Sequence, residues 1–168
     1  FTAVVDSQGK PLASMGSTVL LDGRNVTRDS GTIDLLTSGA LPVSVDIIKG
    51  GDGKDCIYGG IGNDTIDGGT GHDKVYGENG FDSILGGTGN DTVWGGLQDD
   101  SICGNDGNDS LFGDDGDITA AGGGADCING GAGNDTIKGE EGNDTLDGDL
   151  GNDLVYGNGG DELLVEAN

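Results

Sequence analysis

Residues 59–67 read Gly59-Gly60-Ile61-Gly62-Asn63-Asp64-Thr65-Ile66-Asp67, and this nine-residue unit recurs along most of the chain. Acids recur every nine residues from Asp55 to Asp109, and after an interval of 17 residues the series resumes and runs to Glu162. An aliphatic residue follows each acid by two positions, and a glycine precedes it by two, with Gln98 as the one departure. Three residue classes kept in phase over this length predict a repeat protein whose units stack on their neighbours.

Composition divides the chain near Lys49. The 168 residues carry a formal net charge of −24, include 38 glycines and are only 32% hydrophobic. Residues 1–49 carry a net charge of −1, whereas the rest carry −23 and 33 of the glycines. Low hydrophobicity with high net charge predicts disorder unless something else stabilises the fold. No apolar run approaches the ~20 residues of a membrane span, and 31 acidic residues against seven basic ones argue against nucleic acid as a partner.

We therefore expect a β-rich N-terminal segment at 1–49, serving as a cap or assembly strand, with strands at 1–5, 17–21, 32–36 and 43–48. Twelve nonapeptides are expected at 50–165, and 166–168 form a tail.

The interruption of the series has two interpretations. Two repeats, one of them a residue short, would put Ile118 in the acid position and Ala120 in the aliphatic position. One repeat from Gly113 to Asn129, with an eight-residue insertion near 114–124, keeps every acid and aliphatic position filled, and we adopt it.

The unit resembles the nonapeptide of the RTX (repeats-in-toxin) family of secreted bacterial proteins. Over residues 50–165 this resemblance implies an all-β fold, a right-handed parallel β-roll. In that fold each nonapeptide supplies a six-residue calcium-binding turn and a three-residue strand, and two nonapeptides form one coil, so the chain would have about six coils. The resemblance also implies a bacterial protein that is secreted, extracellular or at the cell surface.

The residue types of the turn independently favour Ca²⁺. This ion takes six to eight oxygen ligands from carboxylates and carbonyls, and glycine allows the chain to bend tightly enough to aim successive carbonyls at one ion. Residues 18 apart stack, so an ion is expected between successive acids on each edge, roughly eight to ten Ca²⁺ in all. The expected metal residues are Asp55, Asp64, Asp73, Asp82, Asp91, Asp100, Asp109, Asp126, Asp135, Asp144 and Asp153, with Gly53, Gly62, Gly71, Gly80, Gly89, Gly107, Gly133, Gly142 and Gly151.

Acids stacked about 4.8 Å apart repel one another until a cation lies between them. We expect the repeat region to be expanded without calcium and to fold cooperatively with it. Extracellular calcium modules bind with Kd on the order of 10⁻⁴–10⁻³ M, so such a fold would form outside the cell and not in the cytosol.

One outward row of the repeats is aromatic. It contains Tyr58, Tyr76, Trp94, Phe112 and Tyr156, interrupted by Lys138. Either the rings stack within the chain under the cover of residues 1–49, or the row is a contact with another molecule.

No catalytic motif stands out, and we expect no enzyme. The single histidine, His72, lacks companion ligands and is expected to face solvent, and the strand serines have no histidine in the same repeats. No catalytic motif precedes the repeats and only 166–168 follow them, so the first hypothesis is an extracellular calcium-binding structural protein, a surface, matrix or filament-forming component. Self-association, head to tail, is its expected partner interaction. The alternative is a C-terminal secretion and folding module of a larger RTX enzyme, toxin or adhesin.

Overall fold

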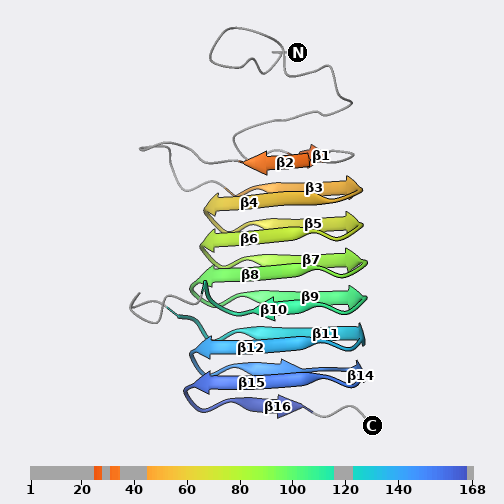
Figure 1. Cartoon of the computed structure of the whole chain (residues 1–168). Coiled ribbons are helices and arrows are strands. Elements are labelled where there is room, and N and C mark those ends of the chain that lie inside the picture. Colours follow the sequence, from red (N-terminus) through yellow and green to blue (C-terminus); the bar gives the residue numbers. More distant parts are fainter. Residues whose placement is uncertain (1–24, 28–30, 35–44, 116–122, 166–168) are drawn as a thin grey trace, which may run out of the picture.

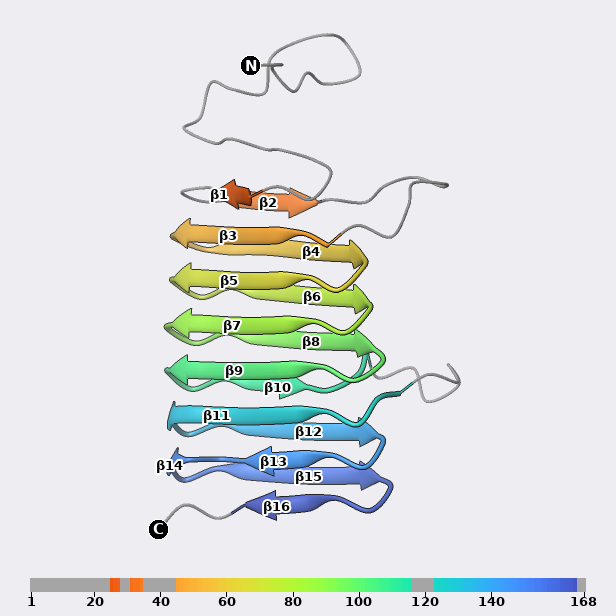
Figure 2. The same cartoon turned by 180° about the vertical axis from the view of Figure 1, so that it is seen from behind.

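The computed structural model describes residues 25–27, 31–34, 45–115 and 123–165. These residues form a parallel β-solenoid of about six coils, and they include no helix. Figures 1 and 2 show the coils stacked in sequence order, with each coil contributing one strand to each of two sheets. The expected strands at 1–5 and 17–21 lie outside the described residues.

Every strand pairing in the described residues is parallel. The first sheet contains β1 (Asn25–Thr27), β3 (Ile47–Asp52), β5 (Thr65–Thr70), β7 (Ser83–Thr88), β9 (Ser101–Asp106), β11 (Cys127–Gly133), β13 (Thr145–Asp147), β14 (Leu150–Gly151) and β16 (Leu163–Val165). The second sheet contains β2 (Gly31–Asp34), β4 (Asp55–Ile61), β6 (Lys74–Asn79), β8 (Thr92–Leu97), β10 (Ser110–Phe112), β12 (Thr136–Glu141) and β15 (Leu154–Gly159).

The core is a double row of aliphatic side chains between the two sheets. Alternate residues of a strand face opposite sides, so each short strand turns one side chain inward, and Ile66 in β5 pairs in register with Ile84 in β7. Each member of the rows is at most 2% exposed: Ile48, Ile57, Ile66, Val75, Ile84, Val93, Ile102, Leu111, Ile128, Ile137 and Leu146. The stacking with two nonapeptides per coil is therefore confirmed.

The register across the interruption is that of one repeat enlarged by eight residues. Ile102 in β9 pairs with Ile128 in β11, and Leu111 in β10 pairs with Ile137 in β12. Each pair is 26 residues apart, where other coils have 18.

The solenoid also extends before residue 50. The expected boundary between 49 and 50 falls within β3, and Ile48 in that strand is fully buried. Val26 in β1 pairs with Ile48, and Ile33 in β2 pairs with Ile57, so part of the N-terminal segment continues both sheets. Among the described residues, no helix could span a membrane.

Candidate metal centre

The acids of the repeats form two columns, one along each edge of the solenoid. The first column lies where the chain enters the strands of the second sheet and contains Asp55, Asp73, Asp91, Asp109, Asp135 and Asp153. The second column lies in the turns that lead into the first sheet and contains Asp46, Asp64, Asp82, Asp100, Asp126, Asp144 and Glu162. All members from Asp46 to Asp144 are at most 5% exposed, whereas Asp153 and Glu162, in the last coil, are half-buried.

In the columns, the Oδ1 atom of each Asp from Asp64 to Asp153 accepts a backbone N–H of the coil before it. The backbone N–H of Asp73 donates to Asp91 Oδ1 at 2.8 Å, and that of Asp64 donates to Asp82 Oδ1 at 2.7 Å. The same bond crosses the interruption, from the Asp100 N–H to Asp126 Oδ1 at 2.8 Å. Each of these Asp side chains is therefore hydrogen-bonded to the backbone of the coil before it, which fixes the direction of its second oxygen. The repeat pattern did not reveal this role.

The second carboxylate oxygen of these residues, Oδ2, lacks a hydrogen-bond partner among the described residues in most members of the columns. Within the described part of the chain, Oδ2 has no hydrogen-bond partner in Asp64, Asp73, Asp82, Asp91, Asp100, Asp109, Asp126, Asp135 and Asp144. A buried polar atom without a partner is rare and costly, and a buried charge is more costly still. A regular series of such atoms in both columns indicates positions built for a ligand.

A backbone carbonyl converges with each of these oxygens. A methyl group placed on Gly59 would lie 2.8 Å from Asp64 Oδ2 and 2.7 Å from the carbonyl oxygen of Gly77. In the first column, a methyl group on Gly86 would lie 2.9 Å from both Asp91 Oδ2 and the Gly104 carbonyl oxygen. The lack of a side chain at the first glycine of the repeat keeps this space open, so these glycines belong to the site although the sequence analysis did not select them.

The glycines that were selected shape the turn. All nine have φ between 111° and 152°, a conformation that glycine adopts without a Cβ penalty. Gln98 takes the same place with φ 78°, so here a residue with a side chain bears the left-handed backbone.

Burial makes the metal-free carboxylates poor acids. Removal from water raises the pKa of Asp82 and Asp109 to about 7 and that of Asp100 to about 8. The backbone N–H bonds lower these pKa values, and neighbouring carboxylates raise them further. At neutral pH the columns therefore favour either a proton or a cation.

The donor set fits calcium. Carboxylate and carbonyl oxygens are the ligands that Ca²⁺ prefers, and each position pairs an Oδ2 with a carbonyl of the next coil. The described residues contain no group of three or more His, Cys, Asp or Glu side chains arranged to hold a metal ion. The turns that would hold Ca²⁺ place a carboxylate oxygen beside a backbone carbonyl oxygen, and the bound ion would supply positive charge to the columns.

The fifth residues of the turns from His72 to Asn152 on the edge of the first column form a further hydrogen-bonded ladder, which the sequence analysis missed. Asn90 Oδ1 accepts from the Asn108 N–H at 3.1 Å, and Asn134 Oδ1 accepts from the Asn152 N–H at 3.0 Å. The exposed His72 occupies the same place, and its Nδ1 accepts from the Asn90 N–H at 2.7 Å. His72 is therefore part of the turn.

The aromatic row is stacked along the second sheet. Ring centroids are 4.7 Å apart between Tyr58 and Tyr76, 4.5 Å between Tyr76 and Trp94, and 5.4 Å between Trp94 and Phe112, with nearly parallel planes. The Lys138 ammonium then lies 5.2 Å from the Phe112 ring centroid. The ring faces in this part of the row are thus used within the chain.

Comparison with known proteins agrees with this geometry. A family model, the RTX calcium-binding nonapeptide repeat, matches residues 44–75, 67–102, 76–111, 99–117, 120–155 and 138–165, which is more than half of the chain. A search of curated proteins found no match. The matched segments begin before Asp46, in agreement with the extra unit that the buried Asp46 and Ile48 complete. The chain belongs to the family of RTX calcium-binding nonapeptide repeat proteins.

Proposed function

We propose that this chain is an extracellular structural protein, a surface or matrix component whose repeat region folds when it binds Ca²⁺. The observation that carries the proposal is the pair of acid columns, in which buried carboxylates follow one another with one unpartnered oxygen each from Asp64 to Asp144. Among the described residues, the ion pairs Lys49–Asp67 and Lys138–Glu140 involve carboxylates outside the columns. Cation binding and folding then share one free energy.

The proposed location outside the cell rests on the calcium affinity that is typical of extracellular sites. Extracellular calcium modules bind with Kd on the order of 10⁻⁴–10⁻³ M. With a net charge of −24, the chain would repel itself in calcium-poor cytosol and become compact where calcium is plentiful.

A calcium titration followed by far-ultraviolet circular dichroism tests this function. The expected result is a cooperative change from coil to β, with little response to the same concentration of Mg²⁺, which demands a stricter octahedral geometry. A β spectrum that persists in excess EGTA at neutral pH would refute calcium-dependent folding.

Head-to-tail assembly is the proposed use of the folded roll. Leu164 in β16 is in register with Leu146 yet is 55% exposed, whereas Leu146 is fully buried. Leu163 and Val165 are exposed beside it, so the last coil presents both a strand edge and the end of the core. We propose that β1 and β2 of a second copy extend the two sheets at this end, and a head-to-tail contact of this kind generates a filament if it does not close.

Electron microscopy in millimolar calcium tests the assembly. We expect filaments for the native chain and single particles for Leu164→Asp, which places a charge at the end of the core. Single particles of the native chain at high concentration would refute the proposed filament.

We also propose the aromatic row as a second contact between copies or with another protein. Its inner rings face one another, so a partner would meet ring edges and the exposed Tyr156. The emission of Trp94, the single tryptophan, should shift to shorter wavelength if assembly covers the row. Unchanged emission across the assembly transition would refute this contact.

The alternative is a secretion and folding module of a larger RTX enzyme, toxin or adhesin. The uncovered last coil favours it as well, because a further segment of one longer chain would bury Leu164 as effectively as a second copy. The mass of the native product discriminates between the two. A mature product near 16.7 kDa supports the structural protein, and a longer product with a catalytic segment supports the module.

A further inference from the structure

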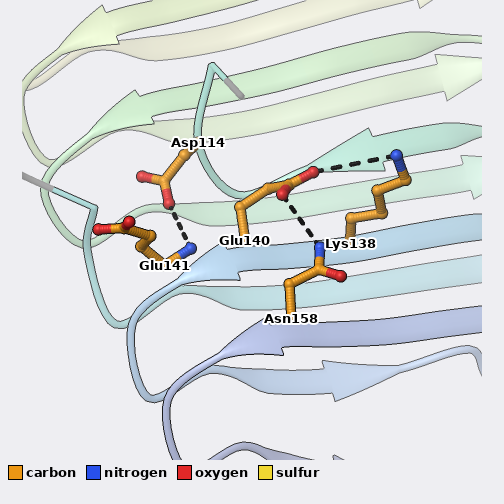
Figure 3. Close-up of polar contacts among 5 residues, drawn as sticks. All are labelled: Asp114, Lys138, Glu140, Glu141 and Asn158. Atoms are coloured by element: carbon orange, nitrogen blue, oxygen red, sulfur yellow. Dashed lines mark hydrogen bonds and ion pairs between the residues drawn. The ribbon is translucent and has the colours of Figure 1, made fainter. Parts of the chain in front are cut away.

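The interrupted coil has a buried carboxylate besides the acids of the two columns. Asp114 follows Gly113 where the insertion begins, two positions after Phe112. In the neighbouring coils the residues two positions after Trp94 and Lys138 are Gly96 and Glu140. Asp114 is only 6% exposed, and Figure 3 shows its side chain directed towards the backbone of the next coil.

The two carboxylate oxygens of Asp114 have different surroundings. Oδ2 accepts the backbone N–H of Glu141 at 3.0 Å, which ties the start of the insertion to β12 (Figure 3). A methyl group on Gly123, where the described chain resumes after the insertion, would lie 2.8 Å from the same Oδ2 and 2.6 Å from the Glu141 carbonyl oxygen. Oδ1 is buried and has no hydrogen-bond partner among the described residues, although the Gly124 N–H is close enough to the carboxylate to lower its pKa. The hydrogen bond from the Glu141 N–H explains the burial of Oδ2 but not that of Oδ1.

A position of the second column lies immediately beside Asp114. A methyl group on Gly113 would collide with Asp126 Oδ2 and with the carbonyl oxygen of Gly139, so these two oxygens converge next to Gly113. Asp126 Oδ2 also lacks a partner within the described residues. The Asp114 charge acts on Asp126, and the Asp144 charge acts on Asp114, which places all three carboxylates in one electrostatic neighbourhood.

We propose that Asp114 Oδ1 joins Asp126 Oδ2 and the Gly139 carbonyl oxygen in a calcium site of the interrupted coil that has more negative charge than the other sites. The inference rests on the proposed calcium binding of the columns. Calcium affinity increases with the number of charged ligands, so this site fills first and fastens the coil that the insertion interrupts. Sequence position alone does not identify Asp114, because the same place in the other repeats of the second sheet holds glycine, glutamate or asparagine.

Calcium binding by the full chain, measured by equilibrium dialysis with circular dichroism, tests the site. Asp114→Asn retains an amide oxygen that can accept the Glu141 N–H but removes the charge. Asp115→Asn is the matched control, because Asp115 is adjacent, exposed and carries the same charge. We expect the native chain and Asp115→Asn to bind about one Ca²⁺ ahead of the rest, and Asp114→Asn to bind that ion at least about tenfold more weakly.

The outcomes separate this inference from the general function. Absence of calcium binding in the native chain would refute the proposed function, whereas a native isotherm in Asp114→Asn would refute the role of Asp114 alone. If Asp114→Asn fails to fold in saturating calcium, a Tb³⁺ titration of the calcium-loaded native chain tests the site instead. Trp94 serves as the sensitiser, because its ring stacks on Phe112 close to the site. A first phase of about one equivalent supports a site of higher charge, and uniform replacement of all ions refutes it.

Discussion

Acid should partly replace calcium in folding this protein. Burial raises the pKa of Asp82 to about 7 and that of Asp64 and Asp73 to about 6, from an ordinary value of 3.8. Between about pH 4 and 7 the metal-free fold therefore binds more protons than the unfolded chain. Stability of the metal-free fold must then rise as the pH falls through this window.

The magnitude is large compared with the stability of a small domain. At about 1.4 kcal/mol per pKa unit, charging Asp82 costs the fold about 4 kcal/mol, and charging Asp64 or Asp73 costs about 3 kcal/mol each. Domains of this size are stable by only ~5–15 kcal/mol. A few charged carboxylates are thus enough to unfold the metal-free roll at pH 8.

Circular dichroism in EGTA from pH 8 to pH 5 measures this effect. We expect β signal to appear as the pH falls, and Asp82→Asn to move the midpoint to higher pH because fewer protons are then required. Asp161→Asn, an exposed position, is the control and should leave the midpoint in place. A spectrum in EGTA that does not change over this range would refute the inference that charge in the columns opposes folding.

Three further substitutions test individual parts of the repeat, the first through the calcium midpoint of folding and the other two through urea unfolding in calcium. Gly59→Ala puts a methyl group between the two converging oxygens of one site and should raise the calcium midpoint. Gly159→Ala, whose methyl group would meet one backbone oxygen at 3.2 Å and no carboxylate oxygen among its nearest atoms, should raise the midpoint less, and equal midpoints would contradict the site. Ile84→Ala should cost about 2–5 kcal/mol in urea unfolding with calcium present, because Ile84 is 1% exposed, and Leu85→Ala on the outer face should cost far less. Gln98→Gly should stabilise the fold by about 1 kcal/mol, because φ is 78° there, and a loss of stability would show that the glutamine side chain matters more than the backbone.

Much of the fold could be predicted because three residue classes in the repeat share the same period. The acid, the aliphatic residue and the glycine each recur every nine residues, and the coil of two nonapeptides that the RTX resemblance implies converts this period into 18-residue stacking. Requiring filled acid and aliphatic positions gives the register across the insertion. The unit at Asp46 and Ile48 was missed because Ser44 stands where the other units, apart from Gln98, have glycine. A count of nine back from Asp55 would have found it.

The finer features of the metal centre depend on geometry that a repeat pattern does not carry. The N–H bond that holds each Oδ1 joins residues from different coils, so only the stacked structure reveals that one oxygen remains unpartnered. The first glycine of each repeat looked like a turn residue, yet its missing side chain keeps the space beside Oδ2 open. Asp114 stands at a repeat position where the other repeats of the second sheet have glycine, glutamate or asparagine, so the pattern does not select it, yet the fold buries it beside the second column.

The most direct test is a crystal structure grown in millimolar calcium, with anomalous scattering used to locate the ions. Peaks are expected along both edges, with one beside Asp64 Oδ2 and the carbonyl oxygen of Gly77 and equivalents in successive coils. Turns that hold only water, with each Oδ2 bonded to solvent or to another part of the protein, would contradict the conclusion that these columns exist to bind calcium.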